Sequence, residues 1–308
     1  MKNLCYNHSM YTCVQNGTEA LLALGAVPNR PLSELTSFKI GGNAAWVLIP
    51  DAYETVGRAI GICQKIGLPY YVLGRGTNIL ASDKGYSGLI IRMEQPIHEP
   101  IWNGAHVTVC AGTSLTKLAK ESVERGFMGM ERLCGIPGSV GGACAMNAGA
   151  YGAEIKQILS RVRVLQNGID AWQTVDPDTL GYRKSPFAFP DCIVLEAEFS
   201  LMPDDGTAAE TMRECTRKRR AKQPLSYPSA GSVFKRPTGN FAGALIEQCG
   251  LKGVSVGGAQ VSELHAGFII NTGHATEHDV TTLIEKIQEV VLAQTGTALE
   301  CEIKRLEG

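Results

Sequence analysis

The sequence predicts an α+β fold built in at least two parts. In the first half, helix-like spacing of apolar residues alternates with strand-like runs, and glycine-rich loops connect them. A turn cluster at residues 203–206 separates this half from a second part with its own helical patterns. The length of 308 residues also exceeds what a single hydrophobic core usually holds, so two or three subdomains are expected.

The elements of the first half follow from spacing and turn signals. Asp51, with Glu54 three residues later, is typical of a helix start, and apolar residues then recur at helical intervals up to Ile66. A strand is expected next and runs straight into a short glycine loop. The second α/β passage repeats this order and ends in a longer glycine-rich loop. The expected segments are strands at 68–73, 106–110, 159–166 and 193–200, a helix at 114–125, and loops at 74–78 and 135–152.

The second part begins after residue 205. Thr207 and Glu210 have the spacing of a capping box, which predicts a helix that ends in the basic run 217–220. Gly250 marks the end of another helix, and Thr276 with Asp279 predicts the start of a longer one with an apolar stripe. The expected segments are helices at 207–220, 240–248 and 276–291 and a final strand at 299–304.

Charge and composition exclude several classes of protein. The 29 basic and 30 acidic residues nearly cancel, which argues against a nucleic-acid or anionic-membrane partner, and no apolar run is long enough for a membrane span. The N-terminal residues lack a signal-peptide pattern, so a cytoplasmic small-molecule protein is expected, with a monomer as the default assembly. The ten cysteines form no C-x-x-C pair and are expected to be reduced and packed.

Two further features are interpreted as surface chemistry. The basic run 217–222 spreads around a helix axis and is expected to be mostly a solvated face rather than a nucleic-acid patch. His274 and His278 stand four residues apart, but without an evident third ligand they predict no metal site.

The loop at residues 74–78, Gly-Arg-Gly-Thr-Asn, has the composition of a phosphate cradle. Glycines let main-chain N–H groups turn toward an anion, and Thr77 and Asn78 add side-chain donors. A tight glycine turn between strands explains the same residues equally well. The loop is not a dinucleotide fingerprint, because Ile79 stands where a third glycine would be needed, and it lacks the Gly-Lys-Ser/Thr ending of a Walker loop.

The loop at residues 135–152 is more unusual, because it is a run of Gly and Ala with almost no bulky side chains. Such a segment lets a large flat ligand and its pyrophosphate lie directly against the backbone, whereas the alternative is close packing of a helix on a strand. Two such loops predict a ligand with two ends. The candidate cofactor-binding residues are Gly74, Arg75, Gly76, Thr77, Asn78, Ile136, Pro137, Gly138, Ser139, Gly141, Gly142, Ala143, Asn147 and Gly149.

These loops and four further segments resemble a known family. Residues 37–42, 74–78 and 135–143 resemble the flavin-binding half of the UDP-N-acetylenolpyruvoylglucosamine reductases. Residues 182–185, 230–235 and 299–304 resemble the three active-site segments of that family, in the same order. The similarity runs from about residue 32 to residue 308.

The resemblance implies the fold and the cofactors. The first half is expected to be an FAD-binding half of the vanillyl-alcohol-oxidase (PCMH) type in two α/β subdomains, residues 1–90 and 91–205. An α+β substrate-binding domain is expected at 206–302, with the tail 303–308 packing back on the first subdomain. The cofactor implied is non-covalent FAD, with NADPH as co-substrate. The reaction implied is reduction of the enolpyruvyl ether of a UDP-amino sugar in cell-wall precursor synthesis.

The family's active-site roles can be placed on Arg183, Ser232 and Glu302. Arg183 offers a planar cationic fork for the substrate carboxylate, and a nearly completely buried, protonated Glu302 would donate a hydrogen bond to the enediolate. Ser232 would protonate the second carbon, with help from a cation such as Lys235. Each of the three residues taken alone has an ordinary structural explanation. The catalytic roles are assigned because all three occur together within segments that resemble the family.

The substrate-binding residues are less closely defined by the resemblance. Lys222 is a candidate for binding the substrate diphosphate or the NADPH phosphate, and Lys235 is a further candidate for substrate binding. Only 38 residues lie between Arg183 and Lys222, which resembles the shorter, type II form of the family. That form lacks the segment with the tyrosine that closes over the sugar nucleotide, and Tyr151 and Tyr227 are the candidates to replace it.

Two alternatives remain at the level of the sequence. Another FAD oxidoreductase of the same superfamily would share both glycine loops without needing the Arg, Ser and Glu set. A non-catalytic nucleotide-binding module would hold phosphate in the same loops but carry no flavin.

Overall fold

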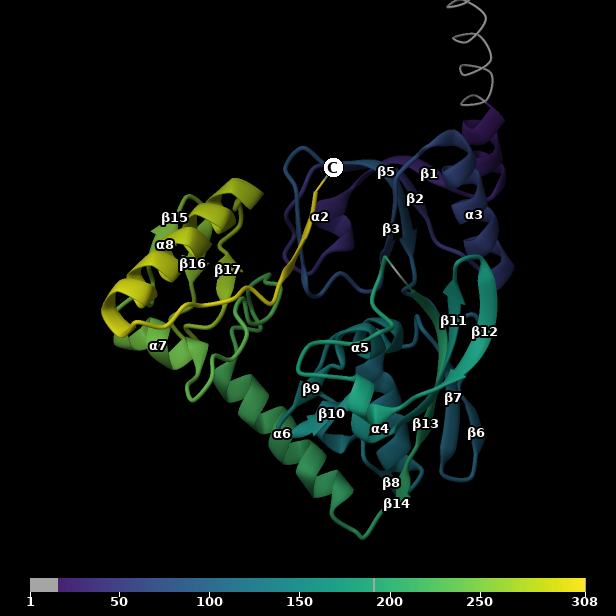
Figure 1. Ribbon diagram of the computed structural model, residues 1–308. Coiled ribbons are helices and arrows are strands. Elements are labelled where there is room, and N and C mark those ends of the chain that lie inside the picture. Colours follow the sequence, from purple (N-terminus) through teal and green to yellow (C-terminus); the bar gives the residue numbers. More distant parts are fainter. Residues whose placement is uncertain (1–15, 191, 308) are drawn as a thin grey trace, which may run out of the picture. The chain divides into compact units, whose positions relative to one another are not determined.

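The computed structural model describes residues 16–190 and 192–307 and divides into two compact units (Figure 1). The first unit contains the described residues up to Arg30 together with Ala44–Gly74 and Ser87–Asp204. The second contains Pro31–Asn43, Arg75–Tyr86 and the described residues from Asp205 onward. Cys5 and Cys13, two of the cysteines expected to be reduced, lie outside the described residues.

The first unit contains a four-stranded sheet and the helix α3. The strand order is β1-β2-β5-β3, and β3 runs parallel to β5 with Tyr70 opposite Leu89. The predicted helix is present, and it buries Val56 and Cys63. Asp51 does not cap it, because the N-cap position falls on Ala52. The bounds are β1 (Val27–Pro31), β2 (Asn43–Leu48), α3 (Tyr53–Ile66), β3 (Tyr70–Leu73) and β5 (Tyr86–Arg92).

A five-stranded antiparallel sheet forms the rest of the framework of this unit. Its order is β12-β11-β13-β7-β6, and β7, β11 and β13 have the bounds that the strand-like runs predicted. Ser114 caps α4 by accepting a hydrogen bond from the amide of Lys117. The bounds are β6 (Ile101–Asn103), β7 (His106–Cys110), α4 (Leu115–Glu124), β8 (Phe127–Met128), α5 (Val140–Met146), β9 (Gly149–Ala150), β10 (Ala153–Glu154), β11 (Leu159–Gln166), β12 (Ile169–Thr174), β13 (Ile193–Ser200) and β14 (Met202–Pro203).

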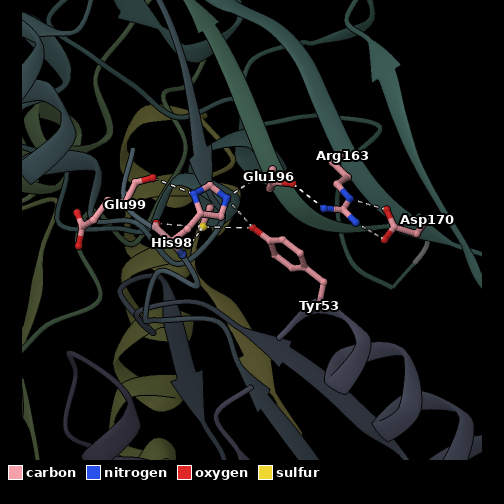
Figure 2. A network of polar contacts seen from close by, with 7 residues as sticks. Tyr53, His98, Glu99, Arg163, Asp170 and Glu196 are labelled. Carbon is pink, nitrogen blue, oxygen red and sulfur yellow. Dashed lines mark hydrogen bonds and ion pairs between the residues drawn. The ribbon is translucent and has the colours of Figure 1, made fainter. Parts of the chain in front are cut away.

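A network of polar side chains connects α3 to the five-stranded sheet (Figure 2). The carboxylate of Glu196 accepts from Arg163 and pairs with Nε2 of His98, both at 2.8 Å. Tyr53, at the start of α3, donates to Sγ of Cys110 at 3.2 Å, and the Arg163 guanidinium lies over its ring. Because these residues come from both predicted FAD-binding subdomains, the network helps to hold the two segments in one unit.

The network also shifts the pKa of its histidine. Burial lowers the pKa of His98, but its hydrogen bonds to the Glu99 carbonyl and the Glu196 carboxylate raise it by more, so the net pKa lies above the ordinary value. Burial, followed by the bond to Cys110, raises the pKa of the Tyr53 hydroxyl. His98 therefore favours its charged form here.

The glycine-rich segment 135–152 is not a continuous loop as predicted, because residues 140–146 form the helix α5. Ser139 is its N-cap, and the carbonyls of Thr113 and Ala111 accept from the amides of Val140 and Gly141 at 2.9 and 2.8 Å. These contacts from a neighbouring segment offset the poor helix propensity of consecutive glycines. The alternative explanation, close packing of glycine, applies at Gly141, where an added Cβ would lie 2.8 Å from the Cβ of Ala111.

The second unit surrounds its own hydrophobic core, in which α8 packs against β15, β16 and α7. Phe38, Ile40 and Leu80 contribute to this core from the two early segments. The predicted capping box at Thr276 and Asp279 is confirmed. The bounds are α2 (Leu32–Leu35), β4 (Ile79–Ala81), α6 (Ala208–Lys222), α7 (Ala242–Gln248), β15 (Ser255–Val256), β16 (Ala259–Val261), β17 (Ile269–Asn271), α8 (Glu277–Thr295) and β18 (Lys304–Leu306).

Two predicted details of this unit are wrong. The hydroxyl of Thr207 makes no capping bond to α6, since this residue has a ψ of −15° rather than the extended backbone of a typical N-cap, and the hydroxyl donates to Asp205 at 2.6 Å. The last strand is not 299–304 but β18, since its register is set by parallel pairing with β4, which places Lys304 opposite Ile79. The C-terminal strand thus pairs with a segment from the first 90 residues, and the expected packing of the tail 303–308 on an FAD-binding subdomain stays a prediction.

The compact units and the expected subdomains are different divisions of the chain. The change of unit at Asp204 and Asp205 coincides with the boundary expected near residue 205. Residues 31–43 and 75–86, expected within the first FAD-binding subdomain, belong instead to the unit that contains the C-terminal residues. The three-part functional division 1–90, 91–205 and 206–302 stays a prediction.

Candidate active site

The loop at residues 75–78 belongs to the second unit and has the backbone of a tight turn. Gly76 is buried and has a φ of +64°, and a Cβ added there would lie 2.3 Å from the carbonyl oxygen of Leu35. Its own carbonyl accepts from the amide of Ser37 at 3.0 Å. The carbonyl of Asn78 accepts from the amide of Lys304 at 3.0 Å. Only glycine fits this position, and the loop carbonyls are used inside the unit.

The amide groups of the same loop are differently placed. Within the described part of the chain, the N–H groups of Arg75, Gly76 and Thr77 have no hydrogen-bond partner. Gly76 is buried and Thr77 is partly buried, whereas Arg75 is exposed, and a buried backbone N–H without a partner is rare and costly. Consecutive N–H groups in a turn form anion sites. The loop can therefore hold a phosphate.

The structure brings the segments of Ser232 and Glu302 together in the second unit. The amide of Glu302 donates to the carbonyl of Val233 at 2.7 Å, and Phe234 is bridged to Cys301 in antiparallel fashion. The side-chain amide of Asn78 donates to the carbonyl of Glu302 at 3.2 Å. The first glycine loop and two of the predicted active-site segments are thus directly hydrogen-bonded, although 224 residues separate Asn78 from Glu302.

The side chains of these segments differ from expectation in one respect. Glu302 is half-buried rather than nearly completely buried, because the neighbouring Ile303 takes the core position and alternate residues of an extended chain face opposite sides. Ser232 is exposed. The ammonium of Lys235 pairs with the carboxylate of Glu300, which is largely exposed. Lys235 is therefore engaged with a carboxylate in this unit rather than free to assist Ser232.

The remaining predicted substrate residues lie on the surface of the second unit. Lys222 is the last residue of α6 and is exposed, and Tyr227 is 49% exposed in the segment that follows. Tyr151, the other candidate for the closing tyrosine, belongs to the first unit and has a φ of +52°.

His265 is a candidate residue that the sequence interpretation missed. Its ring packs edge-on against Phe268, and its Nδ1 accepts from the amide of Gly267 at 3.1 Å. The carbonyl of Gly267 accepts from Val233, next to Ser232. Burial, followed by the charge of Lys252, lowers the pKa of His265, with a smaller contribution from Lys222. A neutral imidazole therefore supports the Ser232 segment, and the Ser-Glu-Leu-His turn at 262–265 was the available signal.

The second glycine-rich segment lies in the first unit. The amides of Val140, Gly141 and Ala143 donate to protein carbonyls, and that of Gly142 donates to the hydroxyl of Ser139. Within the described residues, the amides of Gly138 and Ser139 have no partner. The start of this segment, rather than its whole length, is available to an anion.

Arg183 and Asn147 are brought together in the first unit. Arg183 has a φ of +55°, and its guanidinium donates to the carbonyl of Gly149 at 3.3 Å. Asn147 is fully buried, and its side chain donates to the carbonyl of Gly181 at 2.9 Å. The side chain of Asn147 is thus used inside the protein, although its sequence position suggested cofactor contact.

The described part of the chain was expected to contain no metal site and to carry reduced cysteines. No three His, Cys, Asp or Glu side chains gather there as a metal site would require. The eight cysteines described are free, and Cys134 and Cys144, which flank the glycine segment, are buried as expected. Burial raises the pKa of the Cys144 thiol to about 12. No helix among the described residues has the length and apolar character of a membrane span.

Comparison with known proteins identifies the family. Residues 44–168 match the FAD binding domain family, and residues 223–306 match the family described as UDP-N-acetylenolpyruvoylglucosamine reductase, C-terminal domain. A UDP-N-acetylenolpyruvoylglucosamine reductase from Caldanaerobacter subterraneus subsp. tengcongensis is 43% identical over 280 residues, which cover 90% of this chain and 92% of the relative. The chain belongs to the UDP-N-acetylenolpyruvoylglucosamine reductase family.

Further members of the family agree over nearly the whole chain. The UDP-N-acetylenolpyruvoylglucosamine reductase of Agathobacter rectalis is 42% identical over 309 residues and covers 96% of this chain and 98% of its own length. The crystal structure of the reductase (MurB) from Thermus caldophilus matches with a TM-score of 0.76 at 33% identity, over 91% of this chain and 98% of its own.

Membership of the UDP-N-acetylenolpyruvoylglucosamine reductase family confirms the predicted fold class. The chain is α+β, with a matched FAD binding domain over residues 44–168 followed by the reductase C-terminal domain over residues 223–306. The FAD-binding match includes residues 75–78 and the whole of the second glycine segment, 135–152. The individual site residues remain predictions.

Proposed function

We propose that this chain catalyses NADPH-dependent reduction of UDP-N-acetyl-3-O-enolpyruvylglucosamine to UDP-N-acetylmuramate through non-covalently bound FAD. The reaction would serve peptidoglycan precursor synthesis in the cytoplasm. Family membership and the matched FAD-binding domain support this proposal. At the level of the site, the proposal rests on one hydrogen bond. The side-chain amide of Asn78, the last residue of the phosphate-type loop, donates to the carbonyl of Glu302.

The described residues fit FAD. The unpartnered amides of Arg75, Gly76 and Thr77 in one unit, and those of Gly138 and Ser139 in the other, are suited to phosphate oxygens. The raised pKa of Cys144 keeps this buried thiol protonated, and a protonated thiol is a poor nucleophile. That environment favours non-covalent binding of the flavin.

When bound, the flavin supplies hydride transfer between NADPH and the enolpyruvyl double bond, and the protein supplies position, charge and a proton. In our proposal Arg183 binds the enolpyruvyl carboxylate, because its guanidinium presents a planar pair of donors. Glu302, acting as a carboxylic acid, donates a hydrogen bond to the same carboxylate as negative charge develops on it. Ser232 delivers the proton to the adjacent carbon. Lys222 and Tyr227 bind the nucleotide portion of the substrate.

The competing hypothesis of an FAD oxidoreductase with a different substrate is less economical. It accounts for the FAD-binding match but not for the match of residues 223–306 to the reductase C-terminal domain. A flavin-free nucleotide-binding module is disfavoured by the FAD-binding match itself.

Separate measurement of the two half-reactions tests the proposal. In stopped-flow experiments, NADPH should bleach the flavin absorbance of the purified protein, and the UDP-enolpyruvyl sugar should restore it without oxygen. Ser232→Ala should leave the first step near its normal rate and slow the second by about 10²-fold or more, because the residue acts only in protonation. Ser255→Ala, at an exposed site of the same unit, is the matched control. Reduced flavin that stays reduced in the presence of the sugar would rule out the proposed substrate.

A further inference from the structure

The turn that carries Arg183 has an unusual backbone. Gly181 and Lys184 exchange two backbone hydrogen bonds, of 3.1 and 3.2 Å, which close a four-residue turn. Arg183, at its third position, has a φ of +55°. Glycine or asparagine normally occupies such a position, and a residue with a long side chain is held there only by its surroundings.

Asn147 provides a large part of those surroundings. Its side-chain nitrogen donates to the carbonyl of Gly181 at 2.9 Å and to the carboxylate of Glu154 at 3.2 Å. Its side-chain oxygen accepts from the amide of Lys156 at 3.0 Å. The partners fix the orientation of the side-chain amide, because a flipped amide would face its oxygen toward a carbonyl and a carboxylate. The exposed fraction of Asn147 is 0%.

The rest of segment 147–156 adds two contacts to the same turn. The ammonium of Lys156 donates to the carbonyl of Leu180 at 3.2 Å, and the carbonyl of Gly149 accepts from the guanidinium of Arg183 at 3.3 Å. Asn147 itself has a φ of +44° and ends α5, the helix formed by the glycine-rich segment. Hydrogen bonds therefore connect the turn to the end of α5 both through the backbone of the turn and through the guanidinium of Arg183.

We propose that Asn147 is a positioning residue of the reductase, which acts by holding the Arg183 turn against the end of the glycine-rich segment. The inference rests on the proposed function, because it gives Arg183 its role at the substrate carboxylate. Asparagine meets two demands at once: it tolerates the left-handed backbone, and its amide supplies both donors and the acceptor that the buried site uses. Glycine would keep the backbone but lose every side-chain bond.

Asn147→Gly and Arg183→Gln, measured singly and together in the flavin-containing protein, test this inference. Asn147→Gly should retain flavin and its reduction by NADPH, and it should slow reoxidation by the UDP-enolpyruvyl sugar on the order of 10²-fold, the usual effect of a small misplacement of a catalytic group. Because both changes act through one guanidinium, the double variant should be little slower than Arg183→Gln alone. Asn167→Gly is the matched control, since Asn167 has a similar φ of +51° but is exposed.

Each outcome separates the inference from the proposed function. Normal reoxidation in Asn147→Gly, or a loss that multiplies with that of Arg183→Gln, would overturn the positioning role while leaving the function intact. Normal reoxidation in Arg183→Gln would remove the proposed role of Arg183 and the inference with it. If Asn147→Gly does not fold, Lys156→Met removes only the bond to Leu180 and should slow the same step by a smaller factor. No slowing in Lys156→Met would then count against the fastened turn.

Discussion

Gly76→Ala provides a sharp test of the cofactor loop, because two separate costs can be assigned to one methyl group. The φ of +64° puts the residue in the left-handed region, which costs a residue with a Cβ about 1 kcal/mol. The new Cβ would also lie 2.3 Å from the Leu35 carbonyl oxygen and 2.9 Å from the Cα of Thr36. Both are backbone atoms, so relief requires main-chain movement, and overpacking of this kind costs about 1–3 kcal/mol. The expected total is about 2–4 kcal/mol.

Gly296→Ala is the matched control in the same unit. Gly296 has a φ of +69°, but no neighbouring atom lies within 4 Å of an added Cβ, so only the backbone cost of about 1 kcal/mol is expected. Urea unfolding followed by circular dichroism gives the change in free energy of unfolding for both flavin-depleted variants. Absorbance gives the bound flavin per chain, which Gly76→Ala alone should lower. Equal destabilisation by the two variants would refute the steric reasoning, and full flavin retention by Gly76→Ala would refute the placement of the cofactor at this loop.

Two further predictions concern stability. The pKa of His98 is raised in the folded protein above its unfolded value of about 6.5, so its stabilisation is complete below that pH and is lost as the pH rises through the folded value. The urea midpoint should therefore fall as the pH rises from about 6.5 through the raised folded pKa, and His98→Gln should reduce that fall. An unchanged profile would contradict the charged pairing with Glu196. Thr276→Ala should destabilise by about 1 kcal/mol, whereas Thr207→Ala, which removes no capping bond, should cost less than about 0.5 kcal/mol in the same measurement. Equal effects would show that the capping box contributes nothing.

Much of the secondary structure could be predicted because it depends on local pattern. The strands β7, β11 and β13 have the bounds expected from strand-like runs, and Thr276 and Asp279, the two partners of the capping box, lie within four residues. The helix α5 escaped prediction because its sequence is poor in helix formers. Its first amides instead use carbonyls near residue 112, which no local pattern indicates.

In the candidate site, too, features within one short segment could be predicted from the sequence, whereas contacts between distant residues could not. The glycine loops and the motif around Ser232 could be found from the sequence, since each is a contiguous run. The bond from Asn78 to Glu302 joins residues 224 positions apart, and the side-chain role of Asn147 depends on a turn more than 30 residues later. The burial of Glu302 was overestimated because the alternation of an extended chain gave the core position to Ile303.

The interleaving of the two units has a consequence for synthesis on the ribosome. Phe38 and Leu80 leave the ribosome early, yet they belong to a core that also contains α8, which ends at Thr295, and is completed only by Ile303. At about 5–20 residues per second, these apolar segments wait on the order of 10–40 s for their partners. Residues 31–43 and 75–86 therefore cannot complete their packing until the C-terminal residues have been made. A chain truncated before α8 would leave these side chains exposed, and we expect it to need a chaperone rather than to persist as a stable fragment.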